Sequence, residues 1–133
     1  MVVASSGVVN MTWIGVIDNY KNVRNMKKNF NVPFTNWKGE VIVTPVKNEN
    51  GEETYKPQII GDIVGKVLFE VIDNQSMQLS GEDKLRAYRV ACKIGKDAEN
   101  VDIEAEDIIL IKKILCPVMA VGGYGQIVDL LEG

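Results

Sequence analysis

The chain has 133 residues, of which 46% are hydrophobic and 25% charged, and its formal net charge at pH 7 is −3. This balance is that of a globular domain with one modest core, so we do not expect the chain as a whole to be disordered. The negative charge disfavours a broad nucleic-acid surface, and the absence of histidine excludes Ser-His-Asp and Cys-His catalysis within one chain.

Residues 1–25 are interpreted as an N-terminal extension, either flexible or an added edge strand. Within it, TWIGVIDNY (12–20) is rich in β-branched and aromatic residues, as strands are. Such a strand would pair at an edge of the fold or with a second protomer. The chain has no run of about 18 apolar residues and no basic segment at its start, so we expect no membrane span and a cytoplasmic location.

Residues 26–133 are predicted to form a single α+β domain that opens with a small antiparallel β unit. Its segments are an alternating apolar strand (30–34), a turn (36–39), a β-branched strand (40–44), an Asn-Gly turn (48–52) and a returning strand (54–56). Two or three strands are not stable alone in water, so we expect helices to cover one face of this unit.

Three to four packed helices are predicted to follow the β unit. The first spans 58–72, where Gly61 and Gly65 lie four apart and would let another element approach closely. The second begins after Ser80, a typical N-cap, and its expected buried face is Leu85, Tyr88, Ala91, Cys92 and Ile94. The last two span 104–115 and 126–132.

Cys92 and Cys116 lie in apolar contexts, RVACKI and KILCPV. This placement favours two buried free thiols in a reducing compartment. A disulfide between neighbouring helices is the alternative.

The stretch VDIEAEDIILIKKIL (101–115) has the outline of a calcium loop that enters a helix. A loop starting at Asp97 would need oxygen ligands where Val101 and Ile108 stand, so calcium binding is not predicted. We expect instead an extended link with Val101 and Ile103 inward. A helix would follow, with acids at its start and with Lys112 and Lys113 at its end, as the helix dipole favours.

Two further motifs are rejected on their spacing. The glycine-rich segment 122–125 lacks the Gly-Lys-Ser/Thr ending of a phosphate loop and is interpreted as a flexible turn between helices. The predicted helix–loop–helix over 84–115 has a long loop, and its second helix begins with acids where DNA-recognition residues would stand. No catalytic residue, cofactor or metal site is predicted.

Three aromatic residues are candidates for contacts with a protein partner or within a homo-oligomer: Trp37, Tyr55 and Tyr124. The alternative, which we favour for each of them, is a place partly buried in the core; Trp37, beside a turn, is the best candidate for an exposed ring. An alternative is binding to nucleic acid through a basic segment formed by Lys21, Arg24, Lys27 and Lys28. A small enzyme is a third class, which would need a cleft that gathers acids from separate elements.

From Met26 onward, four segments carry a resemblance to a known type of protein: MKKNFNVPFTNWKGEVI, GEDKLRAYRVACKI, VDIEAEDIILIKKI and GQIVDLLE. Over about 108 residues, the chain resembles small, uncharacterised proteins of tailed bacteriophages and prophages. The resemblance implies an origin and carries no activity or functional residue. Because such proteins commonly begin with a methionine and a basic, strand-like segment, Met26-Lys27-Lys28 resembles their start, and residues 1–25 would be an extension.

These observations together predict a non-enzymatic phage or prophage accessory protein that acts through protein–protein contacts. Its partner would be another copy of itself, a virion component or a host factor. It would be found in the host cytoplasm or the virion. The expected exposed surface is the hairpin tip and the C-terminal helix.

Overall fold

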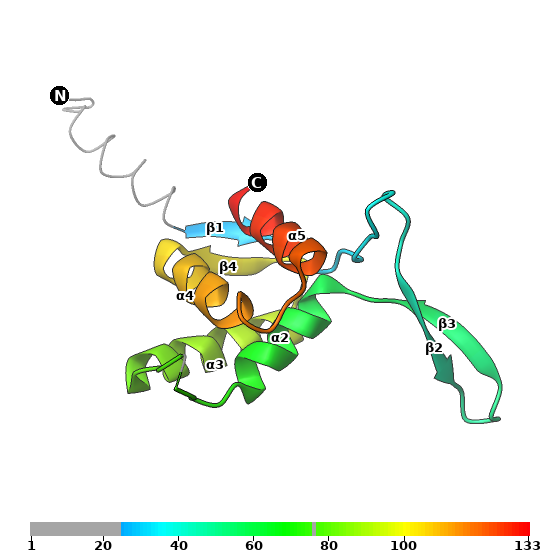
Figure 1. Cartoon of the computed structure of the whole chain (residues 1–133), viewed down its shortest axis with the longest axis horizontal. Coiled ribbons are helices and arrows are strands. Elements are labelled where there is room, and N and C mark those ends of the chain that lie inside the picture. The colour runs from blue at the N-terminus through cyan, green and yellow to red at the C-terminus, as the bar shows by residue number, and fades with distance from the viewer. Residues whose placement is uncertain (1–24, 76) are drawn as a thin grey trace.

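The computed structural model describes residues 25–75 and 77–133 of the chain. In these residues four helices gather around one pair of strands, and a second pair projects away from them (Figure 1). The elements are β1 (Asn25–Lys28), β2 (Val43–Lys47), β3 (Glu53–Pro57), α2 (Ile60–Glu70), α3 (Gly81–Lys96), β4 (Val101–Glu104), α4 (Ala105–Leu115) and α5 (Val121–Glu132). The predicted α+β class, with a small antiparallel hairpin followed by packed helices, is confirmed. The strand expected over 12–20 lies outside the described residues.

β1 and β4 form an antiparallel pair in the middle of the domain. Met26 lies opposite Ile103, and Lys28 lies opposite Val101. The side chains of Val101 and Ile103 are 1% and 0% exposed, so the predicted inward alternation of this segment is confirmed. The pairing with β1 was not predicted, because it joins strands that are far apart in the sequence.

α2 and α3 pack closely because α2 carries glycines where it meets its neighbours. A Cβ atom at Gly61 would lie 3.0 Å from the carbonyl oxygen of Phe30 and 3.2 Å from Cγ2 of Ile94. One at Gly65 would lie 3.6 Å from the same Ile94 atom. The predicted close approach is therefore confirmed. The largest fully buried side chains of the core are Phe30, Ile103, Ile111, Ile114, Leu115, Ile127 and Leu131.

Side-chain caps set the starts of α3 and α4. The Ser80 hydroxyl accepts a hydrogen bond from the Asp83 N–H at 3.0 Å, as the sequence predicted. At α4, the Glu104 and Asp107 side chains each accept from the other residue's backbone N–H, which forms a capping box. Lys112 and Lys113 stand in the last turn of α4, where they complement the helix dipole.

The buried face of α3 agrees with the prediction at Ala91 and Ile94 and differs from it at the other positions. It consists of Ala87, Val90, Ala91 and Ile94, whereas the side chains of Leu85 and Tyr88 are 46% and 51% exposed. Cys92 and Cys116 are both free and exposed, so the expected burial of the two thiols was wrong. In α3, Val90 and Ile94 face the core together with Ala87 and Ala91, whereas Leu85, Tyr88 and Cys92 face outward.

The glycine-rich segment was expected to be a turn, but it is helical, because α5 begins at Val121 and includes Gly122, Gly123 and Gly125. Each glycine costs roughly 1 kcal/mol of helix propensity. Tertiary packing outweighs that cost, since Ile127 and Leu131 of the same helix are fully buried.

The sequence predicted that helices would cover one face of the β2–β3 hairpin, which is called the arm from here on. This prediction was wrong. Every residue of β3 is exposed, and β2 alternates between exposed and half-buried residues. The arm is shaped instead by its turn, where Gly51 has a φ of 80° and the Asn48 carboxamide oxygen accepts from the N–H groups of Asn50 and Glu52, both at 2.9 Å. β2 begins at Val43, three residues later than expected.

Candidate interaction surface

A closed ring of three backbone hydrogen bonds holds the base of the arm. The N–H of Phe34 donates to the carbonyl of Gln58 at 2.8 Å. The N–H of Gln58 donates to Ile42 at 2.9 Å, and that of Ile42 returns to Phe34 at 2.9 Å. We call these three residues the arm root. Because Phe34 is 4% exposed and belongs to the core, the ring fixes the start of the arm to the body of the domain.

Gln126 ties the arm root to α5. Its side-chain Oε1 accepts from the N–H of Thr35 at 2.8 Å and from the Thr35 hydroxyl at 3.2 Å. Its Nε2 donates to the Thr35 carbonyl at 2.8 Å. The amide thus bonds the backbone of Thr35 as a neighbouring strand would. Sequence reasoning missed Gln126, because nothing in the pattern of α5 indicates a partner 91 residues away.

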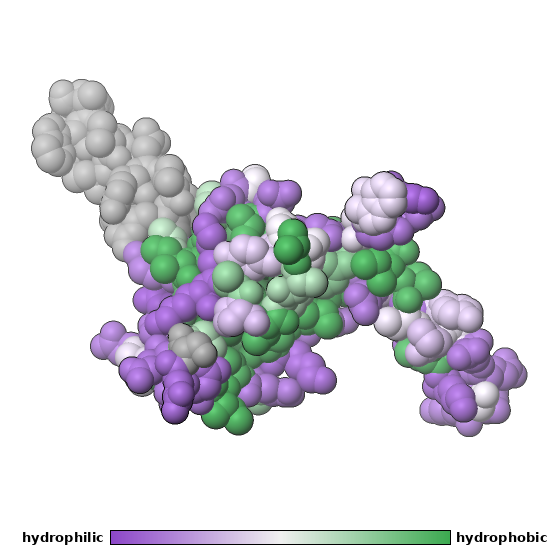
Figure 2. Space-filling view, viewed as in Figure 1, coloured by the Kyte–Doolittle hydropathy of each residue, from purple (hydrophilic) through white to green (hydrophobic). Residues whose placement is uncertain are grey.

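The arm has one apolar face that no described residue covers. Val43 lies opposite Pro57, and Pro45 lies opposite Tyr55. Directly opposite residues point to the same side of a sheet, so these four side chains share one surface, called the apolar face from here on. All four residues are exposed, with Val43 at 49% and Tyr55 at 65%. In Figure 2 the arm is hydrophilic at its tip and hydrophobic nearer the body.

Trp37 lies in a second protrusion next to the arm root. The Asn36 side-chain oxygen accepts from the N–H groups of Lys38 and Glu40, and Gly39 has a φ of 83°, so the predicted turn is confirmed. Trp37 is 91% exposed, so it is not partly buried in the core, and the Lys38 ammonium lies 5.2 Å from its ring centroid. This turn and the arm leave the root in different directions (Figure 1).

Tyr124 is not part of this surface. It lies in α5, where it is half-buried and packs against the core. Of the three aromatic residues selected from the sequence, Trp37 and Tyr55 therefore stand in exposed segments on either side of the arm root, and Tyr124 belongs to the helical body.

The basic segment considered for nucleic-acid binding is only partly described. Lys21 and Arg24 lie outside the described residues. Lys27 is exposed, and the Lys28 ammonium donates to the carbonyl oxygen of Gly133 at 2.8 Å. Lys28 is thus engaged with the C-terminal residue, and nucleic-acid binding stays a prediction.

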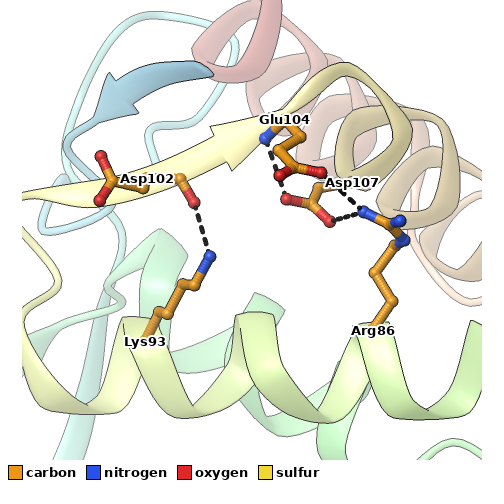
Figure 3. A network of polar contacts seen from close by, with 5 residues as sticks. All are labelled: Arg86, Lys93, Asp102, Glu104 and Asp107. Atoms are coloured by element: carbon orange, nitrogen blue, oxygen red, sulfur yellow. Dashed lines mark hydrogen bonds and ion pairs between the residues drawn. The ribbon is translucent and has the colours of Figure 1, made fainter. Parts of the chain in front are cut away.

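A groove of about 680 Å³ lies between α3 and α4 and gathers acids from three elements, among them Asp83, Glu104 and Asp107. Cations of the same groove bind these acids. Arg86 donates to Asp107 at 2.8 Å and to Glu104 at 3.2 Å, as Figure 3 shows. Lys113 lies 3.7 Å from Asp83.

Asp107 is only 3% exposed, and both oxygens of its carboxylate accept a hydrogen bond. Oδ1 accepts from Arg86, and Oδ2 accepts from the N–H of Glu104 at 2.9 Å. The hydrogen bonds to Asp107, and next those to Glu104, raise the pKa of Arg86 above its ordinary value. Asp107 therefore joins α3 to α4, and its oxygens are not directed at a ligand. The Glu-x-x-Asp spacing is a sequence signal for the bond to the Glu104 N–H only, and the pairing with Arg86, 21 residues away, has no local signal.

Comparisons with known proteins give no assignment: no protein-family model, no curated protein and no solved structure matches the chain. Within residues 25–75 and 77–133, no group of three or more Cys, Asp or Glu side chains is placed to hold a metal ion. None of the helices in this described part is long and apolar enough to cross a membrane.

Proposed function

We propose that the protein is a non-enzymatic accessory protein that acts through protein–protein contacts made by its arm. The observation that carries the proposal is the exposed apolar face of Val43, Pro45, Tyr55 and Pro57 on a hairpin that projects from the helical body (Figure 1). Exposed apolar surface that is raised above the body and bordered by charged residues is typical of an interaction site.

The attachment of the arm supports this role. A two-stranded hairpin is marginal on its own in water, and this one receives no cover from the described helices. The arm root ring and the Gln126 contact nevertheless fix its base to the core. A base held in one orientation reduces the entropy that binding would otherwise cost, which suits a preformed binding element.

The origin in a tailed phage or prophage is the second part of the proposal, and its support is the resemblance of residues 26–133. In that setting the partner is another copy of the protein, a virion component or a host factor, and the location is the host cytoplasm or the virion. The absence of histidine in the sequence and the engaged carboxylates of the α3–α4 groove favour a binding role over catalysis.

A photo-reactive amino acid placed at Tyr55 tests whether the arm contacts a protein in the producing cell. The matched control carries the same group at Ile72, a residue that is 80% exposed and follows α2. We expect irradiation to cross-link the arm variant to a protein, which mass spectrometry then identifies, and to leave the control variant mostly free. Equal cross-linking from both positions, or none from Tyr55 in a folded variant, would contradict the proposal.

A further inference from the structure

The two free edges of the arm differ in their hydrogen-bonding capacity. Two backbone hydrogen bonds, both 2.9 Å long, mark the two ends of the β2–β3 pairing. At the base the N–H of Gln58 donates to Ile42, and at the tip the N–H of Asn48 donates to Glu52. Antiparallel pairs alternate between bonded and non-bonded, so the even-numbered pairs of the arm are the bonded ones. The odd-numbered residues therefore direct their backbone groups outward. Pro45 and Pro57, which lack an N–H, both occupy such positions.

On β2 the outward residues are Val43, Pro45 and Lys47, so a proline interrupts the donors of that edge at its centre. Proline at this position is a common protection of an edge strand against pairing. On β3 the outward residues are Glu53, Tyr55 and Pro57, and the proline stands at the end. Two consecutive outward positions of β3, Glu53 and Tyr55, thus keep both donor and acceptor.

We infer that a second copy of the chain pairs with β3 along this edge, antiparallel and about a two-fold axis at Thr54. In this register Glu53 lies opposite Tyr55 of the second copy, and Tyr55 lies opposite its Glu53. Each of these pairs exchanges two backbone hydrogen bonds, which gives four bonds in all. An axis at Tyr55 would also form four bonds, two between the Tyr55 residues and one from each Glu53 N–H to Pro57, but it would place Lys56 opposite Thr54 and not opposite an acid. The inference rests on the proposed function, because it names the partner of the same arm.

The charges beside Thr54 fit the same register. Glu52 would lie opposite Lys56 of the second copy, and by symmetry the pair would form twice. Among the described residues, neither of these side chains has an ion-pair partner within its own chain. Thr54 would lie opposite Thr54 of the second copy. Both Thr–Thr pairs and opposite-charge pairs are favourable cross-strand neighbours. Two marginal hairpins would then become one four-stranded sheet.

Charge reversal tests the register in the purified full chain, with molar mass measured by light scattering over a range of concentrations. We expect the wild type to form dimers, and Glu52→Lys or Lys56→Glu to weaken dimerisation by roughly tenfold, because each places two like-charge pairs across the axis. The double variant Glu52→Lys/Lys56→Glu restores opposite charges and is expected to dimerise like the wild type. Circular dichroism verifies that all the variants are folded.

A proline pair tests the edge itself. Tyr55→Pro removes one donor per copy from the edge of β3 and is expected to abolish the dimer. Val43→Pro removes a donor from the edge of β2 and is expected to leave the dimer intact. Either of two results would overturn the inference. One is a wild type that stays monomeric at the highest soluble concentration, and the other is a dimer that is weakened by none of Glu52→Lys, Lys56→Glu and Tyr55→Pro. A monomer that still cross-links through Tyr55 to a different protein would refute the second copy as partner and leave the proposed function standing.

Discussion

The side-chain amide of Gln126 and the backbone of Thr35 form a two-way hydrogen-bonded pair, with both N–H···O distances 2.8 Å. A glutamine of the last helix thereby takes the place of a strand beside the arm root. The orientation of the arm thus depends on α5 as well as on the hairpin, and this dependence can be measured.

Replacing Gln126 with alanine is expected to loosen the arm root. Thr35 is half-buried, and its N–H and carbonyl would lose their partner, which costs about 1 to 2 kcal/mol of unfolding free energy. Amide hydrogen exchange at Thr35 should accelerate, while exchange in α3 stays slow. Asp129→Ala, at an exposed position of the same helix, is the control and should leave both rates unchanged. Unchanged exchange at Thr35 in the Gln126 variant would show that the arm root ring alone fixes this segment.

Arg86→Met is expected to lower the unfolding free energy by about 2 to 3 kcal/mol, because it leaves the buried Asp107 carboxylate without its cation. The control is Arg89→Met on the same helix, where the replaced side chain is exposed. It should change stability by less than about 0.5 kcal/mol. Urea denaturation measures both values. Equal effects of the two substitutions would mean that the ion pair to Asp107 contributes no more than an exposed arginine.

The stability difference between the wild type and Arg86→Met should not change from neutral to mildly alkaline pH. The folded-state pKa of Arg86 is raised above its unfolded value by Asp107 and Glu104. The stabilisation is therefore fully present below the unfolded pKa and is lost only as the pH rises through the higher folded pKa. Both values lie far above the neutral range. Denaturation curves for the two proteins at several pH values provide the measurement, and a difference that shrinks at mildly alkaline pH would contradict the assignment.

Two glycines of α2 should respond in opposite directions to alanine. At Gly61 a Cβ would meet Phe30 and Ile94 at 3.0 to 3.2 Å, so Gly61→Ala is expected to destabilise by about 1 to 3 kcal/mol. At Gly65 the nearest atom is 3.6 Å away, an ordinary contact, so Gly65→Ala should gain up to about 1 kcal/mol of helix propensity. Thermal unfolding of both variants measures the contrast. A stabilising Gly61→Ala would show that α2 can shift away from Phe30 at little cost.

Both cysteines should react with an alkylating reagent in the folded protein, because Cys92 and Cys116 are free and exposed. We expect reaction rates close to those of the unfolded chain, as measured by mass spectrometry over time. Burial at either site would slow its reaction strongly and would favour the interpretation drawn from the apolar sequence contexts. Cys92→Ser and Cys116→Ser assign the two rates.

Local signals were sufficient for most of the element assignments. Ser80 caps α3 through its own side chain, and the Asn48 and Gly51 turn closes the arm through contacts within five residues. The inward alternation of Val101 and Ile103 follows from strand geometry alone. These features depend on neighbours in the chain, so the sequence displays both halves of each interaction.

The wrong predictions concern features that depend on contacts between elements far apart in the sequence. Leu85 and Tyr88 lie on the outward side of α3, where the Tyr88 ring centroid is 5.8 Å from that of Phe69 in α2, and residue types within α3 do not reveal this placement. The helical state of Gly122 and Gly123 depends on the burial of Ile127 and Leu131. At these glycines tertiary packing overrode a local preference that is worth only about 1 kcal/mol per residue.

The sequence by itself determined the class of fold, the two tight turns and the cap of α3, because propensities and side-chain-to-backbone bonds act over a few residues. Only the tertiary structure showed that the arm stands clear of the helices, that Gln126 supports its root and that Arg86 reaches Asp107. These contacts join residues from 21 to 91 positions apart. Their geometry comes from the packing of whole elements, which no local pattern records.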